Sequence, residues 1–203
     1  MGANLVRLFI NTTSPYARIA RIALWEKGFR DVETRIVDPW GDDPDLLAAN
    51  PAARVPTLVT DDGQALAESL LIVLWLEAVR PEPTLLGGDA AGGVARAGTA
   101  MGVIDAAVHT LIGRKIAGPS FDESPVGLRR RRSMAEGLKR LDADLSEPGD
   151  GTPSLAAIAA AVALDYVQFR FPQAGWMPPV PRLERLQQRM QTRPSVEQTR
   201  PHA

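Results

Sequence analysis

The sequence has 203 residues, enough for one or two compact domains, and its contents of 45% hydrophobic and 23% charged residues are typical of a folded globular protein. This composition excludes a disordered or fibrous chain, and the net charge of −1 argues against nucleic acid or an anionic membrane as a partner. With no cysteine and two histidines, His109 and His202, disulfides and thiol nucleophiles are ruled out, no metal site is expected, and any chemistry falls to hydroxyls, carboxylates, arginines or the backbone.

The first 37 residues predict a β-α-β unit. Residues 5–10 form an apolar run typical of a buried strand, and the polar turn at residues 11–15 ends in a serine and a proline suited to the start of a helix. The helix is expected over residues 16–27 and ends at Gly28, which adopts left-handed backbone conformations easily. Residues 32–37 form the second strand, which should run parallel to the first through a right-handed crossover.

The next segment predicts a short helix, a hairpin and a further helix. The short helix covers residues 45–49, and strands at residues 57–60 and 64–67 flank the turn sequence Asp-Asp-Gly. A strongly apolar helix is expected over residues 70–79. The resulting order is that of a small mixed α/β domain.

A linker rich in proline and glycine, residues 81–93, separates this domain from a second one. Beyond it no strand pair is evident, and helices are expected at residues 95–111, 125–145, 154–169 and 180–192. We therefore predict two domains, residues 1–84 and residues 85–203, the second of them all-helical. Acidic residues follow the four consecutive arginines at 129–132 in the same predicted helix, which favours a solvated helix face.

Three short motifs stand at the junctions of this topology. They are Ser-Pro-Tyr-Ala-Arg at residues 14–18, Asn-Pro at 50–51 leading to Val-Pro-Thr-Leu at 55–58, and Glu-Ser at 68–69. Each is weak by itself, but in this order and topology the whole chain resembles the glutathione transferase superfamily. Residues 161–172 and 193–195 also look like its bacterial members. The resemblance implies a thioredoxin-like α/β N-terminal domain followed by an all-α C-terminal domain.

By the same resemblance, glutathione binds in the first domain. The peptide bond between Val55 and Pro56 is expected to be cis, so that the Val55 backbone faces the peptide of the ligand. Ser69 and nearby backbone amides would take the carboxylate of the γ-glutamyl end, and Glu68 its ammonium. Arg54 stands where many relatives have a basic residue for the glycyl carboxylate, although a solvated loop charge explains it equally well.

Ser14 is the expected catalytic residue. In the serine-type branches that the sequence resembles, this hydroxyl donates a hydrogen bond to the sulfur of glutathione and favours the nucleophilic thiolate. Lowering a thiol pKa by roughly two units takes about 2.7 kcal/mol, whereas one hydrogen bond to a charged group supplies about 1.5 to 3 kcal/mol and a helix N-terminus about 0.3 to 2 kcal/mol. A plain helix cap is the alternative role for Ser14, and Thr13 and Tyr16 are the alternative hydroxyls.

The electrophilic co-substrate is expected in an apolar pocket between the two domains. Its candidate walls are Thr13, Trp40, Met101, Ile104 and Val108, although core packing explains such residues at least as well. The predicted reaction joins glutathione, as co-substrate, to an apolar electrophile without a metal or redox cofactor. The alternatives are a non-catalytic glutathione-binding or scaffold module, and a glutathione-dependent isomerase, dehalogenase or peroxidase.

The remaining expectations concern partners and location. The resemblance implies a homodimer with two-fold symmetry. The sequence opens without a basic region and a long apolar run, and no apolar stretch reaches membrane-spanning length, so a cytoplasmic protein is expected. Without cysteine, no mixed disulfide with glutathione can form, which disfavours thiol-transferase and dehydroascorbate reductase activity. Ala157 departs from the relatives, which usually have a capping aspartate there, three residues after a serine or threonine.

Overall fold

The computed structural model describes residues 6–145 and 151–202. Contacts divide the chain into two compact units, Met1–Leu85 together with Arg193–Ala203, and Leu86–Thr192. The predicted division at residue 84 placed residues 193–203 with the second domain, whereas in the structure they group with the first unit. The reason is a set of polar contacts between this closing segment and the first helix, which no local sequence signal announces.

The first unit is built on a four-stranded sheet with the strand order β2-β1-β3-β4. Strand β1 (Val6–Ile10) pairs parallel with β2 (Val32–Ile36) and antiparallel with β3 (Thr57–Val59), which pairs antiparallel with β4 (Ala65–Ala67). The predicted β-α-β unit and the hairpin are thereby confirmed; the first residue predicted for β1, Leu5, lies outside the described residues.

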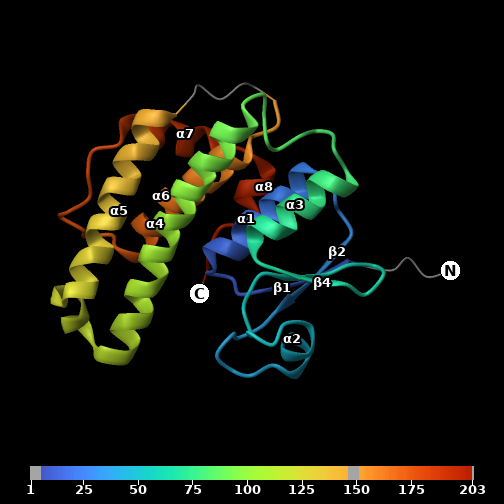
Figure 1. Ribbon diagram of the computed structural model, residues 1–203, viewed down its shortest axis with the longest axis horizontal. Helices are drawn as coiled ribbons and strands as arrows, with labels where there is room; N and C mark the ends of the chain where they lie inside the picture. Colours follow the sequence, from blue (N-terminus) through green and yellow to red (C-terminus); the bar gives the residue numbers. More distant parts are fainter. Residues whose placement is uncertain (1–5, 146–150, 203) are drawn as a thin grey trace. The chain divides into compact units, whose positions relative to one another are not determined.

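Helices cover both faces of this sheet. Figure 1 shows α1 (Pro15–Glu26) and α3 (Ser69–Val79) on one face and α2 (Pro44–Ala49) on the other. Because side chains alternate along a strand, Phe9 packs with Leu46 on the α2 side, while its buried neighbours in β1 point to the opposite face. The sheet is therefore the centre of a two-sided core, as its apolar strands predict.

The second unit consists of helices. They are α4 (Ala90–Ala117), the 3₁₀ helix η1 (Pro119–Glu123), α5 (Pro125–Asp144), α6 (Leu155–Arg170) and α7 (Pro181–Gln191). The described part of this unit contains no strand, and the predicted all-helical character is confirmed. Every residue of α6 from 155 to 164 is buried, which marks it as the central helix. No helix within residues 6–145 and 151–202 is both long and apolar enough to cross a membrane.

The structure corrects the start and the end of the first helix in this unit. The prediction began at residue 95, because the preceding glycines were assigned to the linker, but α4 begins at Ala90 and continues to Ala117. The Asp89 carboxylate accepts a hydrogen bond from the Gly92 amide (2.9 Å) and so starts the helix earlier. At Gly93 a Cβ would lie 2.9 Å from the Leu86 carbonyl oxygen, so the glycine permits a close backbone approach.

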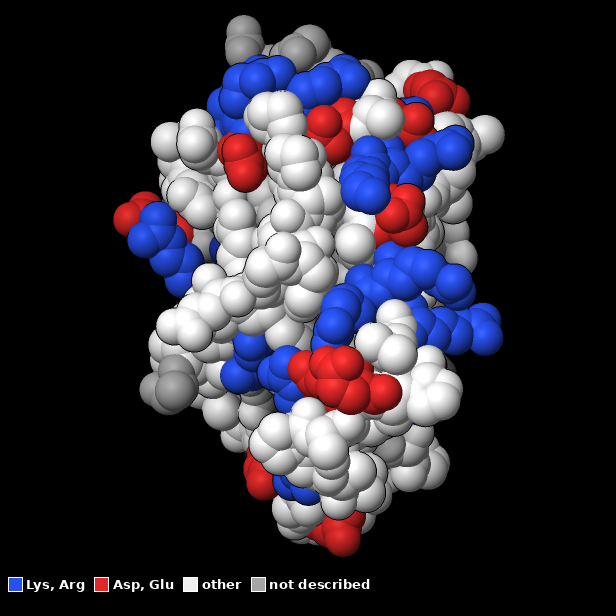
Figure 2. Space-filling view, turned by 90° about the vertical axis from the view of Figure 1, so that its left-hand side faces the viewer, with Lys and Arg blue, Asp and Glu red and all other residues white. Residues whose placement is uncertain are grey.

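Opposite charges are interspersed along α5 and its neighbours. Arg131 pairs with Glu123 at 2.8 Å and Lys139 with Glu136 at 2.8 Å, and Arg140 pairs with Asp144. On the face drawn in Figure 2, Lys and Arg side chains form separate clusters with Asp and Glu between them. The four consecutive arginines thus lie on a helix that also carries acidic partners.

Candidate functional site

The strand register gathers the predicted motifs of the first unit at one end of its sheet. Phe9 of β1 lies opposite Thr57 of β3, and Thr57 lies opposite Ala67 of β4. The chain therefore leaves β1, enters β3 and leaves β4 at the same end of the sheet. These three connections carry Ser14, the Val55–Pro56 bond and the Glu68–Ser69 pair, so segments that are far apart in sequence meet there.

Ser14 is the N-cap residue of α1. Its backbone is extended, with φ −71° and ψ 121°, Pro15 occupies the first helical position, and the Ser14 Oγ accepts a hydrogen bond from the Ala17 amide (3.2 Å). A hydroxyl that only accepts still has its proton to donate. Ser14 can therefore cap the helix and donate to a ligand at the same time, and the two roles left open by the sequence are compatible.

The Thr13 hydroxyl differs from that of Ser14 because it already donates a hydrogen bond to the Asn11 side chain. The Asn11 Oδ1 accepts hydrogen bonds from the Thr13 amide (3.0 Å) and from the Thr13 Oγ1 (2.8 Å). The Ser14 amide closes this turn onto the Asn11 carbonyl (3.2 Å). The Thr13 proton is thus already used, which favours Ser14 among the two neighbouring hydroxyls.

The peptide bond between Val55 and Pro56 is cis, as the resemblance implied. The preceding turn is organised by Asn50, whose buried side chain donates to the Thr57 Oγ1 (3.0 Å) and to the Arg54 carbonyl (3.2 Å). The Asn50 Oδ1 in turn accepts from the Ala52 amide (3.1 Å). Asn50 thus supports the turn before the cis bond, and its position before Pro51 is a turn signal that the sequence already contains.

Ser69 is the first residue of α3 and is buried, with 1% of its surface exposed. Its Oγ has no hydrogen-bond partner in the described part of the chain. The preceding residue, Glu68, has a positive φ of 72°, and no side chain caps this helix. Buried hydroxyls are normally hydrogen-bonded, so an unsatisfied one beside the free amides of a helix start is suited to an anionic group.

Arg54 and Glu68 form an ion pair across the mouth of this site. The Arg54 Nη1 lies 3.4 Å from the Glu68 Oε1, and the two side chains are 72% and 53% exposed. Exposed pairs of this kind contribute at most about 1 kcal/mol, so a ligand with an ammonium and a carboxylate can exchange partners with both residues at little cost.

The residues predicted as walls of the electrophile pocket fall in both units. Thr13 and Trp40 belong to the first, where Trp40 is 61% exposed in the loop after β2. Met101, Ile104 and Val108 share one face of α4 in the second, and Ile104 is completely buried while the other two are partly exposed. The burial of Ile104 agrees with the alternative that this side chain packs in the core.

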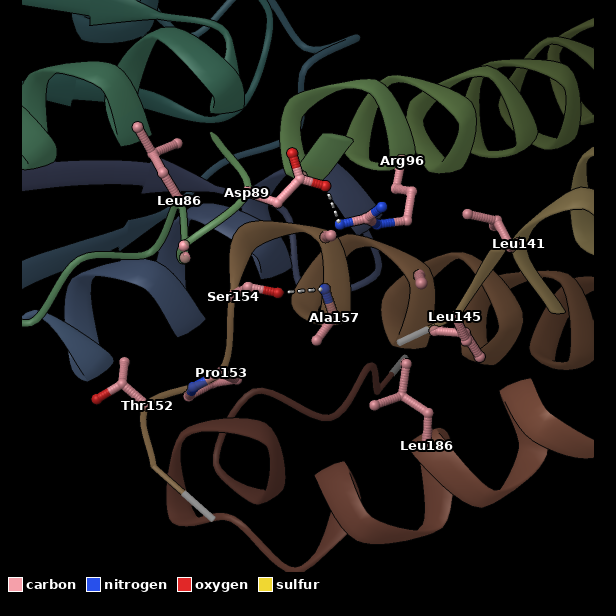
Figure 3. A pocket seen from close by; sticks show the side chains of 15 residues that line it. Leu86, Asp89, Arg96, Leu141, Leu145, Thr152, Pro153, Ser154, Ala157 and Leu186 are labelled. Carbon is pink, nitrogen blue, oxygen red and sulfur yellow. Dashed lines mark hydrogen bonds and ion pairs between the residues drawn. The ribbon is translucent and has the colours of Figure 1, made fainter. Parts of the chain in front are cut away.

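The second unit has a cavity of about 300 Å³ where helices α4 and α6 begin. Figure 3 shows Asp89 paired with Arg96 (3.4 Å) and the Ser154 Oγ accepting from the Ala157 amide (3.2 Å), with the side chains of Leu86, Leu141, Leu145 and Leu186 spread around them. Because Ala157 replaces the usual aspartate, only one half of the capping box is present. Asp89 and Ser154 are thus engaged with partners in the same unit.

In residues 6–145 and 151–202, the acidic and histidine side chains are the groups to consider for metal binding. Within the residues that the structure describes, no group of three or more could hold a metal ion. The polar groups of the site are hydroxyls, an arginine, a glutamate and backbone amides.

Comparison with known proteins identifies the family. The model for the glutathione S-transferase N-terminal domain matches residues 13–79, and the model for the C-terminal domain matches residues 104–186. This chain belongs to the glutathione S-transferase superfamily. The thioredoxin-like α/β domain followed by an all-helical domain, which the resemblance implied, is the fold of this superfamily and is confirmed.

Similar proteins in the superfamily cover the whole chain or its parts. A glutathione S-transferase of Methylobacterium radiotolerans, solved in complex with glutathione sulfonate, is 34% identical, with 98% of this chain and 95% of that chain covered and a TM-score of 0.87. The GST-like protein YibF of Escherichia coli is 29% identical over 206 residues, 97% of this chain and 98% of that protein. Maleylacetoacetate isomerase of Pseudomonas aeruginosa is 36% identical over 85 residues, 40% of this chain and 39% of that enzyme.

Proposed function

We propose that this protein is a glutathione transferase that binds glutathione at the end of the sheet where β1, β3 and β4 meet, and joins it to an apolar electrophile. The observation that carries the proposal is the combination of an uncommitted Ser14 proton with a buried, unpartnered Ser69 hydroxyl at the same end of the sheet. The M. radiotolerans relative, which is solved with glutathione sulfonate, supports the ligand.

Each part of glutathione has a complementary group in this site. The Val55 backbone before the cis bond pairs with the central peptide, and Ser69 with the free amides of α3 takes the γ-glutamyl carboxylate. Glu68 takes the ammonium, and Arg54 takes the glycyl carboxylate once their mutual pair opens. Both charged ends of the tripeptide are thereby neutralised, which leaves the cysteinyl thiol to be directed to Ser14.

Ser14 then stabilises the thiolate. Its proton is free, and it stands at the positive end of the 12-residue helix α1, whose first turn contains no acidic side chain. A hydrogen bond to a charged sulfur and the helix N-terminus together supply about 2 to 5 kcal/mol, enough to lower the thiol pKa by roughly two units. The thiolate attacks the electrophile, the new carbon–sulfur bond forms and the leaving group departs with its electron pair.

A glutathione-dependent isomerase is the second candidate. The similarity to maleylacetoacetate isomerase covers 40% of this chain and favours this alternative over a dehalogenase or a peroxidase. The thiolate, stabilised by the same Ser14, would add to a conjugated cis double bond and form a carbon–sulfur bond, and after rotation about the former double bond this bond would break with its electron pair returning to sulfur. Turnover of a cis-enone diacid without consumption of glutathione would identify this activity.

The proposed protein forms a homodimer and lies in the cytoplasm. Family membership supports a cytoplasmic homodimer that works on a small electrophile. A scaffold module that retains the fold without turnover is the alternative outside the enzymes.

Thermal unfolding with and without S-methyl glutathione tests the proposal. A ligand present at about 100 times its dissociation constant stabilises the folded state by about 2.7 kcal/mol, which raises the Tm of a chain of this length by roughly 5 to 10 °C. A rise of this size followed by conjugation of a chloronitrobenzene supports the transferase. A rise without turnover of any electrophile or cis-enone would favour the scaffold module, and no rise would refute the glutathione site.

A further inference from the structure

The C-terminal segment, residues 193–202, returns to the first unit and follows helix α1. Figure 1 shows its short helix α8 (Pro194–Glu197, red) beside α1 (blue). The Arg193 guanidinium donates two hydrogen bonds, of 3.0 and 2.9 Å, to the Glu26 carboxylate, and the Ser195 hydroxyl donates to the same carboxylate. Ser195 and Val196 are buried, so this end of the segment is firmly anchored.

Successive contacts lead the segment along α1 toward its N-terminus. Arg21 donates to the Gln198 carbonyl (3.0 Å), one turn closer to the start of α1 than Glu26. Thr199 is buried and bonds within the segment, and Pro201 restricts the backbone of the last link. The segment thus reaches the beginning of α1 in an ordered path rather than as a loose tail.

The last contact joins the segment to the turn that carries Ser14. The Thr12 Oγ1 donates a hydrogen bond of 2.7 Å to the His202 carbonyl oxygen, across 190 positions of sequence. Thr12 and Thr13 are the two central residues of the turn from Asn11 to Ser14, which the Ser14 amide closes. Among the described residues, the other side-chain hydrogen bonds of this turn stay within it or cap α1, so the Thr12 bond is the one that connects the turn to a distant segment.

We propose that residues 193–202 act as a positioning element for the thiol site, and that Thr12 is the positioning residue through which they act. This inference rests on the proposed function, because it concerns the placement of the Ser14 hydroxyl against the sulfur of glutathione. Thr12 does not touch the sulfur. Thr12 fixes the position of the turn, and the turn fixes the backbone of Ser14. The direction of the Ser14 hydroxyl, which rotates about a single short side-chain bond, depends on that backbone.

The test compares Thr12→Val, which keeps the shape and removes the donor, with Thr12→Ser, which keeps the donor. A chain shortened by residues 201–203 removes the acceptor, and Thr99→Val is the matched control, since Thr99 bonds only within α4 through its side chain (3.2 Å to the Ala95 carbonyl). Three readouts are compared in the full-length and shortened chains: amide hydrogen exchange over residues 11–17 without ligand, the pH dependence of thiolate absorbance of bound glutathione, and kcat against KM.

We expect Thr12→Val and the shortened chain to exchange the amides of residues 11–17 faster by about threefold to tenfold, the range that one lost hydrogen bond supplies. The pKa of the bound thiol should rise and kcat should fall with little change in KM, while Thr12→Ser and Thr99→Val stay at wild-type values. The shortened chain carrying Thr12→Val should be no worse than either change alone, because both remove the same contact.

The inference is overturned if Thr12→Val leaves both the exchange and the thiol pKa unchanged while the wild-type protein ionises bound glutathione, or if the two changes add. A wild-type protein that does not bind glutathione would instead overturn the proposed function and the role of the segment with it. The first outcome leaves the proposed function intact, so the two failures are distinguishable.

Discussion

Two serine caps, Ser14 in the first unit and Ser124 in the second, differ in what their hydroxyl protons do. In the second unit Asp89 accepts from Gly92, and Ser124 both accepts from Gly127 (3.0 Å) and donates to the Phe121 carbonyl (2.6 Å), whereas Ser154 only accepts from Ala157 (3.2 Å) and no side chain caps α7. In the first unit no side chain caps α3, and within residues 6–145 and 151–202 the buried Ser69 hydroxyl has no partner and Ser14 accepts without donating.

A serine at a helix start therefore has no single meaning. Ser14 and Ser124 occupy the same position relative to a following proline and helix, and both accept from the amide three residues on. They differ in the hydroxyl proton, which Ser124 donates to the Phe121 carbonyl and for which Ser14 has no acceptor among the described residues. The unused proton of Ser14 supports its proposed contact with the sulfur of glutathione, and the next three predictions test this comparison.

The largest effect is expected from replacing the two serines by alanine. Ser14→Ala should lower kcat/KM with a chloronitrobenzene by about 10- to 100-fold, because a hydrogen bond to the charged sulfur contributes about 1.5 to 3 kcal/mol. Ser124→Ala is the matched control; it should lower the Tm by a few degrees through loss of a cap and leave the rate unchanged. Equal rates for Ser14→Ala and wild type would reduce Ser14 to a cap like Ser124.

A smaller effect is expected at Ser69, where a substitution should weaken ligand binding without lowering the stability of the free protein. Ser69→Ala should weaken binding of S-methyl glutathione by about tenfold, because the ligand carboxylate loses one of its donors. The same change should not destabilise the free protein, since the hydroxyl that it removes is buried and unsatisfied. Binding is measured by calorimetry and stability by urea unfolding; a variant that is less stable without ligand and binds normally would show that the hydroxyl has a structural role.

The smallest effect concerns Glu26, a charged group of the first unit whose partners are all within the chain. Burial by itself would raise the pKa of this carboxyl, but hydrogen bonds from Arg193 and Ser195 outweigh burial and hold the pKa below its ordinary value of 4.5. A carboxyl with a lowered folded-state pKa stabilises above its unfolded pKa, and this contribution is lost as the pH falls through the folded value. Glu26→Gln should therefore cost about 1 kcal/mol at neutral pH and progressively less below about pH 4.5.

Urea unfolding of Glu26→Gln and wild type at several pH values, below and above the ordinary carboxyl pKa of 4.5, measures this difference in the free energy of unfolding. Glu33→Gln is the control, because the pair between Glu33 and Arg7 (2.9 Å) is 43% exposed on both sides and should contribute little at any pH. Parallel stability profiles for Glu26→Gln and wild type would contradict the assigned pairing with Arg193.

Local signals in the sequence determined the element order and the motif positions. Apolar runs bounded by glycine and proline predicted the strands and most helices, since such signals act over about one turn of chain. The motif containing Val55 and Pro56 and the serines that open α1 and α3 were recognisable in the same way. The start of α4 could not be recognised in this way. It depends on the Asp89 cap and on the close approach of the Leu86 carbonyl to Gly93, and the glycine in the sequence does not by itself reveal that approach.

Only the tertiary structure decided how these pieces work together. The strand register brings the three connections to one end of the sheet, the Asn11 side chain uses the Thr13 proton and spares that of Ser14, and Asn50 holds the turn before the cis bond. The bond between Thr12 and His202 joins residues 190 positions apart. Contacts over such separations depend on how the whole chain packs. The sequence pattern therefore predicts the residue types at the site. The fold decides which of their hydroxyl protons already have an acceptor within the chain and which can be donated to a ligand.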